Sequence, residues 1–212
     1  MSPAHGLVFV VDDDLSVREA LSSLIRSVGL QVETFASADA FRARLMQPID
    51  SATCLVLDVR MPGTSGLDLQ RELVAARSAI PIVFITGHGD IPMTVRAMKA
   101  GAVEFLPKPF REQDLLDAVR GALAQSSARR RDDAATAEVR ARFATLSARE
   151  REVLALLARG LRNKQTADQL GISEVTVKVH RHNIMEKMQA ASLPSLLSMI
   201  GRIEATGGAG RP

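Results

Sequence analysis

Hydrophobic and polar positions follow two different patterns along the chain. Up to about residue 125, short apolar runs alternate with amphipathic stretches, which predicts strands followed by helices. The expected strands lie at 7–11, 31–35, 54–57, 82–85 and 103–106, and the expected helices at 15–28, 38–46, 66–77, 90–100 and 111–125. Five such units predict an α/β doubly wound (βα)5 domain with a parallel sheet in the order 2-1-3-4-5.

The pattern changes after residue 125. Residues 126–143 are rich in alanine and charge and poor in core residues, which predicts a linker, partly helical. Residues 144–205 show only helical periodicity and predict an all-α domain of four helices with a helix-turn-helix outline. Residues 206–212 are glycine-rich and are expected to form a flexible tail. The chain is therefore predicted to hold two domains, at 5–125 and 144–205.

Charge is divided unevenly between these two domains. Residues 1–125 hold 12 Lys+Arg against 15 Asp+Glu, whereas residues 146–212 hold 10 against 6. A basic half of this kind suits a polyanion such as nucleic acid. No apolar run is long enough to span a bilayer, the N-terminus lacks the pattern of a signal peptide, and a single cysteine, Cys54, excludes an internal disulfide. We expect a cytoplasmic protein without a membrane partner.

Aspartates follow two of the predicted strands. Asp12, Asp13 and Asp14 come directly after the first strand, and Asp58 comes directly after the third. Because strands one and three are neighbours in the expected sheet, three or four carboxylates are predicted to converge at its carboxyl edge. Such a cluster is unfavourable without a cation, and hard oxygen ligands on an open crevice favour Mg²⁺.

Two further residues extend this acidic cluster. Thr86, just past the fourth strand, supplies a hydroxyl, and Lys108, just past the fifth, supplies a positive charge. Carboxylates, a hydroxyl and a lysine on neighbouring loops predict a phosphoryl-binding site with Asp58 as the acceptor. An alternative is a phosphatase of the haloacid-dehalogenase type, because Asp12 and Asp14 also form an Asp-x-Asp pair after the first strand. For Asp14 alone, capping of the next helix is a simpler role.

Four segments at the ends of these strands carry a family resemblance. They are Val10–Asp14, Leu57–Gly63, Ile85–Asp90 and Phe105–Phe110. Together they resemble the receiver domain of response regulators, over about residues 5–125. The resemblance implies that a sensor histidine kinase transfers a phosphoryl group to Asp58. It also implies that Mg²⁺ is held by Asp13, Asp58 and the carbonyl of Arg60, with Asp12 acting nearby or through water.

The same resemblance implies roles for residues around the acceptor. Thr86 and Lys108 would contact the phosphoryl oxygens, and Phe105 would be the switch aromatic that moves with Thr86. The alternative for Phe105 is a plain core residue. Arg60 and His88, each two residues past a site residue, would tune the lifetime of the phosphoryl group. In this interpretation the chain is not an enzyme beyond catalysing its own aspartyl phosphorylation and dephosphorylation.

The helix predicted from Ser173 to Met188 carries the basic character of the second domain. Lys178, Arg181 and His182 stand at i, i+3 and i+4 and share one face, which suits the major groove of DNA. The apolar positions of this helix that are available for packing include Val175, Val179, Ile184 and Met188.

Three segments of the second domain resemble the LuxR-type helix-turn-helix domain. They are Leu146–Leu154, Gly160–Lys164 and Thr176–His180. The resemblance implies that Lys178, Val179 and His182 face bases, where relatives often have lysine at the position of His182. It implies that Asn163, Lys164 and Arg181 meet the DNA backbone.

The two halves together resemble response regulators of the FixJ type. That resemblance implies a phosphorylation-dependent transcriptional regulator, an activator. Its partners would be a sensor histidine kinase, a double-stranded DNA operator, RNA polymerase and, on phosphorylation, a second copy of the chain. The alternative is a constitutive DNA-binding protein whose first domain serves only as a dimerisation scaffold.

Overall fold

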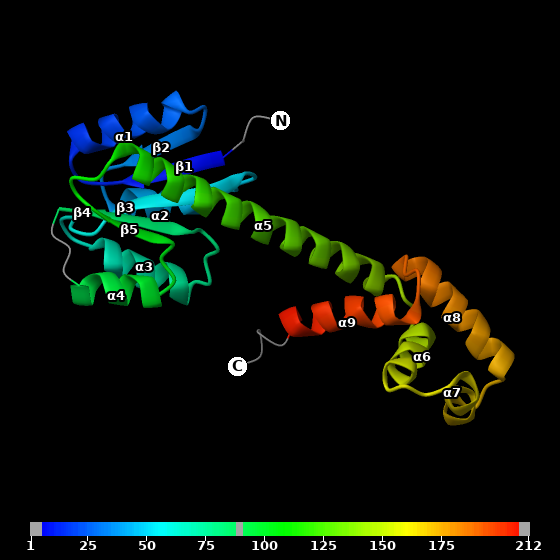
Figure 1. Ribbon diagram of the computed structural model, residues 1–212. Helices are drawn as coiled ribbons and strands as arrows, with labels where there is room; N and C mark the ends of the chain where they lie inside the picture. The colour runs from blue at the N-terminus through cyan, green and yellow to red at the C-terminus, as the bar shows by residue number, and fades with distance from the viewer. Residues whose placement is uncertain (1–5, 88–90, 208–212) are drawn as a thin grey trace. The chain divides into compact units, whose positions relative to one another are not determined.

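The structure is a computed structural model that describes residues 6–87 and 91–207 (Figure 1). The chain divides into two compact units, Met1–Arg131 and Asp132–Pro212. In the part of the chain that is described, no helix has both the length and the apolar character needed to cross a membrane.

The first unit is built on a five-stranded parallel sheet. Its strands are β1 (Gly6–Val11), β2 (Gln31–Phe35), β3 (Ala52–Asp58), β4 (Ile82–Thr86) and β5 (Glu104–Pro107), in the order β2-β1-β3-β4-β5. The helices are α1 (Leu15–Ser27), α2 (Ala38–Leu45), α3 (Gly66–Ala75), α4 (Ile91–Lys99) and the first part of α5 (Glu112–Ala144). The predicted doubly wound fold and its strand order are confirmed.

Helices cover both faces of this sheet. On one face, Val10 of β1 packs in a core with residues of α1 and α5 such as Ile25 and Leu115. On the other face, Phe9 packs in a core with residues of α2 and α3 such as Phe41 and Leu69. Burial on both sides explains why β1, β3 and β4 are apolar at nearly every position.

The strand register brings the functional loops to one edge of the sheet. Val11 pairs with Leu57, Asp58 pairs with Ile85, and Thr86 pairs with Pro107. Because the strands are parallel, the residues that follow β1, β3, β4 and β5 all emerge at the carboxyl edge. The four predicted site positions therefore lie at the carboxyl ends of neighbouring strands or just after them.

Residues 126–143, expected to be a partly helical linker, are helical throughout and continue α5. The alanine-rich composition favours the helix. The hydroxyl of Ser126 is buried and accepts a hydrogen bond from the backbone N–H of Thr53 at 3.0 Å. Arg130 donates to the carbonyl of Ile49 at 3.0 Å, and Val139 belongs to the core of the second unit. Each end of the segment is thus part of a folded unit.

After α5, the described part of the second unit has the helices α6 (Ala148–Ala158), α7 (Asn163–Leu170), α8 (Glu174–Met188) and α9 (Leu193–Gly207). The capping box of Ser147 and Glu150 opens α6, as its sequence pattern predicts. Gly171 ends α7 with φ of 64°, a left-handed conformation that glycine adopts without strain. Ser173 then caps α8 by accepting from the N–H of Thr176 at 3.0 Å. These signals produce the tight turn of a helix-turn-helix.

Candidate functional site

The ammonium group of Lys108 bridges two carboxylates at the edge of the sheet. Its Nζ donates to Asp12 Oδ2 at 2.7 Å and to Asp58 Oδ1 at 2.9 Å. Asp12 and Asp58 are only 1% and 5% exposed. Their other oxygens accept backbone N–H groups, Asp12 Oδ1 from Asp14 at 2.9 Å and Asp58 Oδ2 from Arg60 at 2.7 Å. The structure therefore brings together three of the predicted site residues in one hydrogen-bonded group.

This environment changes the proton affinity of both partners. Burial raises the pKa of Asp58; the contacts with Lys108 oppose the rise without cancelling it, and the charge of Asp12 adds to it. Burial alone would lower the pKa of Lys108, but hydrogen bonds to Asp12 and Asp58 outweigh it and raise the pKa. Lys108 is therefore a fixed cation at neutral pH, held against the Asp58 carboxylate.

The prediction that three or four carboxylates converge is wrong in this structure. Asp14 Oδ1 accepts from the backbone N–H groups of Ser16 at 2.8 Å and Val17 at 3.3 Å, so Asp14 caps α1. Aspartate favours such local bonds because its short side chain reaches its own backbone. Asp13 is exposed. Within residues 6–87 and 91–207, no three or more His, Cys, Asp or Glu side chains are grouped to hold a metal.

The position of Asp14 also bears on the phosphatase alternative. An Asp-x-Asp nucleophile motif requires both carboxylates to face the reacting phosphate, and the Asp14 carboxylate is engaged as a helix cap. The geometry thus argues against that alternative.

The remaining predicted residues of the first unit differ in burial and in how far the structure describes them. Thr86 is fully buried, and its carbonyl accepts from the N–H of Lys108 at 2.7 Å. Phe105 is buried, with its ring centroid 6.0 Å from that of Phe84. Arg60 is exposed, and His88 lies outside the described residues. The switch and lifetime roles of these residues stay predictions.

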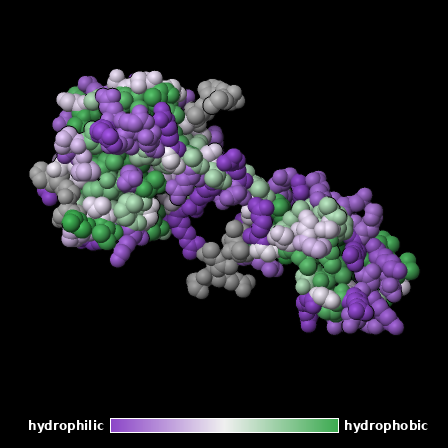
Figure 2. All heavy atoms as spheres, in the orientation of Figure 1, coloured by the Kyte–Doolittle hydropathy of each residue, from purple (hydrophilic) through white to green (hydrophobic). Residues whose placement is uncertain are grey.

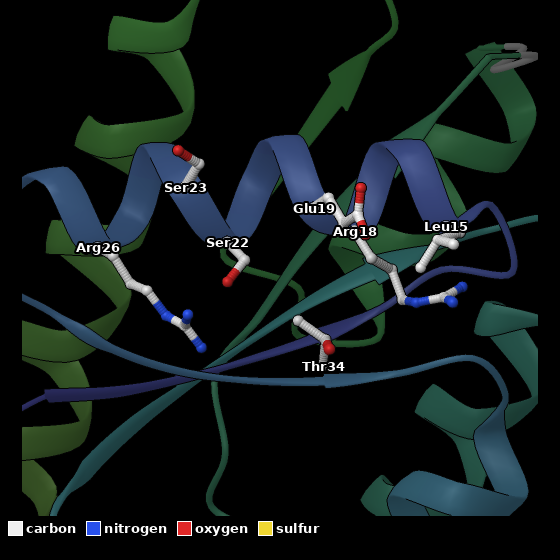
Figure 3. Close-up of a pocket in the computed structure, with 7 residues that line it drawn as sticks. All are labelled: Leu15, Arg18, Glu19, Ser22, Ser23, Arg26 and Thr34. Atoms are coloured by element: carbon white, nitrogen blue, oxygen red, sulfur yellow. The ribbon is translucent and has the colours of Figure 1, made fainter.

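Arg18 is a site residue that the sequence reasoning missed. Its Nη1 donates to the carbonyl of Asp12 at 2.7 Å and to that of Asp13 at 2.9 Å. The side chain lies along a groove between α1 and β2, where Arg26 of the same helix also points (Figure 3). Arg18 holds the backbone of the acidic loop. The only signal in the sequence is an arginine one turn after the Asp-rich segment.

Gly66 is a second residue that the sequence reasoning missed. A Cβ atom at this position would lie 2.2 Å from the carbonyl oxygen of Asp58 and 3.1 Å from Leu57 Cγ. The N–H of Gly66 donates to the carbonyl of Val59 at 3.0 Å. The beginning of α3 therefore packs directly on the backbone of the expected phosphoacceptor, and only glycine leaves room for this contact.

In the second unit, α8 presents the predicted DNA-contacting side chains. Lys178 and His182 are exposed, and Lys178 lies 3.4 Å from Glu174 Oε1. Arg181 donates to Asn163 Oδ1 of α7 at 3.4 Å, so two residues expected at the DNA backbone contact each other. Lys164, also on α7, is exposed.

The apolar positions of α8 divide between two faces. Ile184 and Met188 are buried in the core, as expected for packing positions. Val175 and Val179, which seemed equally available for packing, are instead exposed. The contacts of α8 with α6 and α7 bury the opposite face of the helix.

An ion pair between exposed Lys187 and buried Glu150 links α8 to α6. Lys187 Nζ lies 2.7 Å from Glu150 Oε2, and Glu150 also closes the capping box of α6 by accepting from the N–H of Ser147 at 2.7 Å. The hydrogen bonds from Lys187 lower the pKa of Glu150, although burial acts in the opposite direction. The pair ties the C-terminal end of α8 to the beginning of α6.

Comparison with known protein families matches each unit to a model. Residues 8–120 match the response regulator receiver domain, and residues 144–200 match the bacterial regulatory proteins of the luxR family. The chain belongs to the response regulators. The predicted resemblance and the class of function, transcriptional regulation in a two-component system, are confirmed.

Similar proteins align with this response regulator over almost its whole length. Nodulation protein W of Bradyrhizobium diazoefficiens is 54% identical over 194 residues, covering 92% of this chain and 85% of that protein. The response regulator protein TodT of Pseudomonas putida is 50% identical over 204 residues, covering 96% and 89%. A structure of the response regulator StyR is 55% identical with a TM-score of 0.82, covering 94% of this chain and all of that one. Full-length FixJ from B. japonicum is 42% identical with a TM-score of 0.57, covering 94% and 98%.

Proposed function

We propose that a sensor histidine kinase phosphorylates this response regulator on Asp58 and that phosphorylation controls its binding to a DNA operator. The observation that carries the proposal is the Lys108 bridge, which places a fixed cation against the buried Asp58 carboxylate. A carboxylate oxygen of Asp58 would attack the phosphorus of a phosphohistidine. A phosphorus–oxygen bond forms, the phosphorus–nitrogen bond breaks, and the electron pair leaves with the histidine nitrogen. Lys108 and the Thr86 hydroxyl would then contact the phosphoryl oxygens.

Receiver domains of response regulators generally bind Mg²⁺ at this acidic site. The residues of this chain fit the ion, because the Asp12 and Asp58 carboxylates share only one lysine and supply the oxygen donors that Mg²⁺ prefers. Asp13, which is exposed, follows Asp12 directly in the chain. In the proposal, Asp13, Asp58 and the Arg60 carbonyl hold Mg²⁺, with Asp12 nearby. The bound ion would neutralise part of the charge on the phosphoryl oxygens. Arg60 and His88 would tune the lifetime of the phosphoryl group.

We also propose that phosphorylation makes the chain a homodimer through its fourth and fifth βα units. Ile91, Val95 and Met98 of α4 are exposed and stand at i, i+4 and i+7, which places them on one face. A dimer presents two α8 helices to two half-sites of an operator and raises affinity through effective concentration. The bound dimer would activate transcription by RNA polymerase. The chain would act in the cytoplasm, because operator DNA lies there, and would catalyse only its own phosphorylation and dephosphorylation.

The acceptor assignment is tested by intact-mass analysis after incubation with acetyl phosphate and Mg²⁺. We expect one phosphoryl addition on the unmodified chain and none on Asp58→Asn. Asp39→Asn changes an exposed aspartate of α2 and should behave as the unmodified chain. Equal phosphorylation of Asp58→Asn would contradict the assignment.

The coupling to DNA is tested by sedimentation and by DNA affinity before and after phosphorylation. The probe is the duplex that the phosphorylated chain enriches most strongly from a random library. We expect a monomer to become a dimer, with affinity rising in parallel and falling as salt increases. A chain that is already dimeric and binds equally tightly without phosphate would support the constitutive scaffold instead.

A further inference from the structure

The groove between α1 and β2 is polar and has the size of a small-molecule site. Arg18 and Arg26 line it together with three hydroxyl groups, those of Ser22, Ser23 and Thr34 (Figure 3). Its volume is about 490 Å³, and small-molecule sites commonly measure about 300–1,000 Å³. Hydrophilic side chains lie over α1 in Figure 2. The groove therefore offers cationic and hydroxyl groups to a ligand of this size.

The two arginines of the groove have no carboxylate partner. In the part of the chain that the structure describes, Arg18 contacts two backbone carbonyls of the acidic loop, and Arg26 contacts that of Val32 at 3.4 Å. Arg44 of the same unit, in contrast, forms two hydrogen bonds to the carboxylate of Glu33. A guanidinium group has five N–H donors, so Arg18 and Arg26 each keep donors and an uncompensated charge for an anionic ligand.

The spacing of the two arginines selects the shape of that ligand. Arg18 and Arg26 are eight residues apart on α1, which places their backbones about 12 Å apart along the helix axis. Figure 3 shows their guanidinium groups on either side of Thr34. A ligand that pairs with both therefore needs an anionic group at each end. Phosphate groups suit both positions, because the planar guanidinium fork binds phosphate oxygens in pairs.

The middle of the groove selects against a third anionic group. Glu19 lines the groove together with the Ser22 and Thr34 hydroxyls. Its carboxylate repels an anion but accepts a hydrogen bond from a ligand hydroxyl or amino group. At one end of the groove, Leu15 is 59% exposed and presents apolar surface. A sugar between two phosphates fits the middle, and a flat base fits the surface of Leu15.

We propose that this groove binds a nucleotide that is phosphorylated at both its 5′ and its 3′ position, with one phosphate on Arg18 and the other on Arg26. The site contains neither Asp58 nor the DNA-contacting helix, so it goes beyond the proposed function. Arg18 would contact the ligand and the backbone of the acidic loop at the same time.

Isothermal titration calorimetry of the full unphosphorylated chain at low salt tests the proposal. The probes are adenosine 3′,5′-bisphosphate, adenosine 5′-monophosphate and inorganic phosphate. We expect the bisphosphate to bind about tenfold or more tightly than the monophosphate, because the second phosphate adds a charge-assisted hydrogen bond. Inorganic phosphate should bind most weakly. Arg26→Met, which changes an exposed side chain, should reduce the affinity for the bisphosphate to that for the monophosphate.

Three further variants serve as controls. Arg71→Met removes an exposed arginine of α3 and should bind the bisphosphate unchanged. Lys178→Met should also bind it unchanged, which excludes the basic second unit as the site. Asp58→Asn should keep the binding as well, so the result does not depend on the proposed phosphorylation.

Three results would overturn the nucleotide site. They are equal affinity for the bisphosphate and the monophosphate, full affinity in Arg26→Met, and a loss of binding in Lys178→Met. The absence of any binding of the bisphosphate would overturn it too.

Discussion

Replacing Lys108 by methionine removes the bridging charge and keeps most of the aliphatic stem. The variant loses two hydrogen bonds to carboxylates, at 2.7 and 2.9 Å. It also leaves Asp12 and Asp58 close together, because both oxygens had contacted the same nitrogen atom. Breaking a buried ion pair costs about 3–5 kcal/mol. The Lys108 side chain is 25% exposed, so screening reduces this figure, and we expect a loss of about 2–3 kcal/mol at neutral pH.

Calorimetric unfolding of the full chain measures this loss. For a unit of this size, about 2–3 kcal/mol corresponds to a fall of roughly 6–12 °C in the Tm of the first unit. Lowering the pH should reduce the difference. Without Lys108 the effect of burial is unopposed, and the pKa of Asp58 rises further above its ordinary value. A carboxyl group with a raised folded pKa contributes stability at low pH and loses it as pH rises through that pKa, so the variant recovers as pH falls from neutral toward the ordinary aspartate value of about 3.9.

Millimolar Mg²⁺ should also raise the Tm of Lys108→Met more than that of the unmodified chain, because a divalent cation replaces the missing positive charge. Lys99→Met, which changes an exposed lysine of α4, controls for the loss of a surface charge. A Lys108→Met variant as stable as the Lys99→Met control at both pH values would refute the reasoning from the ion-pair geometry.

Three further substitutions test contacts that hold the two functional regions. Gly66→Ala should lower the free energy of unfolding by about 3 kcal/mol in calorimetry, because its Cβ would meet the Asp58 carbonyl at 2.2 Å. Glu150→Gln keeps the capping box and loses the charge interaction with Lys187, so urea unfolding should show a loss of about 1 kcal/mol at neutral pH. Because the folded pKa of Glu150 is lowered, that difference should shrink as pH falls below the ordinary glutamate value of about 4.3 and vanish once pH is below the lowered folded pKa. Arg18→Met should lower the Tm and slow phosphorylation by acetyl phosphate, since the acidic loop loses its two backbone contacts.

Two of these variants have a control of the same type. Gly121→Ala adds a methyl group where nothing lies within 4 Å and should slightly stabilise α5. Arg26→Met removes the other arginine of the α1 groove and should leave phosphorylation unchanged. A Glu150→Gln difference that is constant with pH would contradict the charge assignment. An unaffected phosphorylation rate in Arg18→Met would remove that residue from the site.

The sheet and the place of the acceptor follow from the sequence because they depend on periodicity and chain order. Apolar runs without alternation predict strands that are buried on both faces, and parallel strands deliver their following residues to one edge. Asp58 and Lys108 could therefore be paired from positions 50 residues apart. The end of α7 and the start of α8 could also be predicted from the sequence. Gly171 ends α7 and Ser173 caps α8 through local backbone conformation and hydrogen bonds within the same turn.

Contacts that depend on how closely two particular helices or strands pack could not be predicted from the sequence. Asp14 was grouped with its neighbours by adjacency, but its short side chain bonds the backbone of α1 instead. Arg18 contacts backbone carbonyl groups. Every residue has such a group, so the sequence around Arg18 does not indicate which residues it will contact. Ser126 forms a hydrogen bond with Thr53, which lies 73 positions earlier in the chain. Its segment of α5 was predicted as a linker because the prediction used only the amino-acid composition of that segment. Which face of α8 is buried is decided by its neighbours, and periodicity alone did not separate Val175 from Ile184.

The contacts of the first unit limit where a new charge on Asp58 can have an effect. A phosphoryl group shifts a conformational equilibrium only through interactions that differ between the two states. On the α1 side, Arg18 holds the acidic loop, and at the other end of the sheet Ser126 holds α5 to β3. The backbone N–H of Lys108, in contrast, donates to the carbonyl of Thr86. If a phosphoryl group attracts the Lys108 ammonium group, the resulting shift therefore acts on the ends of β4 and β5. Strand β5 is the edge of the sheet and contacts α4, the helix whose exposed apolar face is the proposed dimer surface. A physical route from the acceptor through Lys108, β4 and β5 therefore leads to α4, where a second copy is expected to bind.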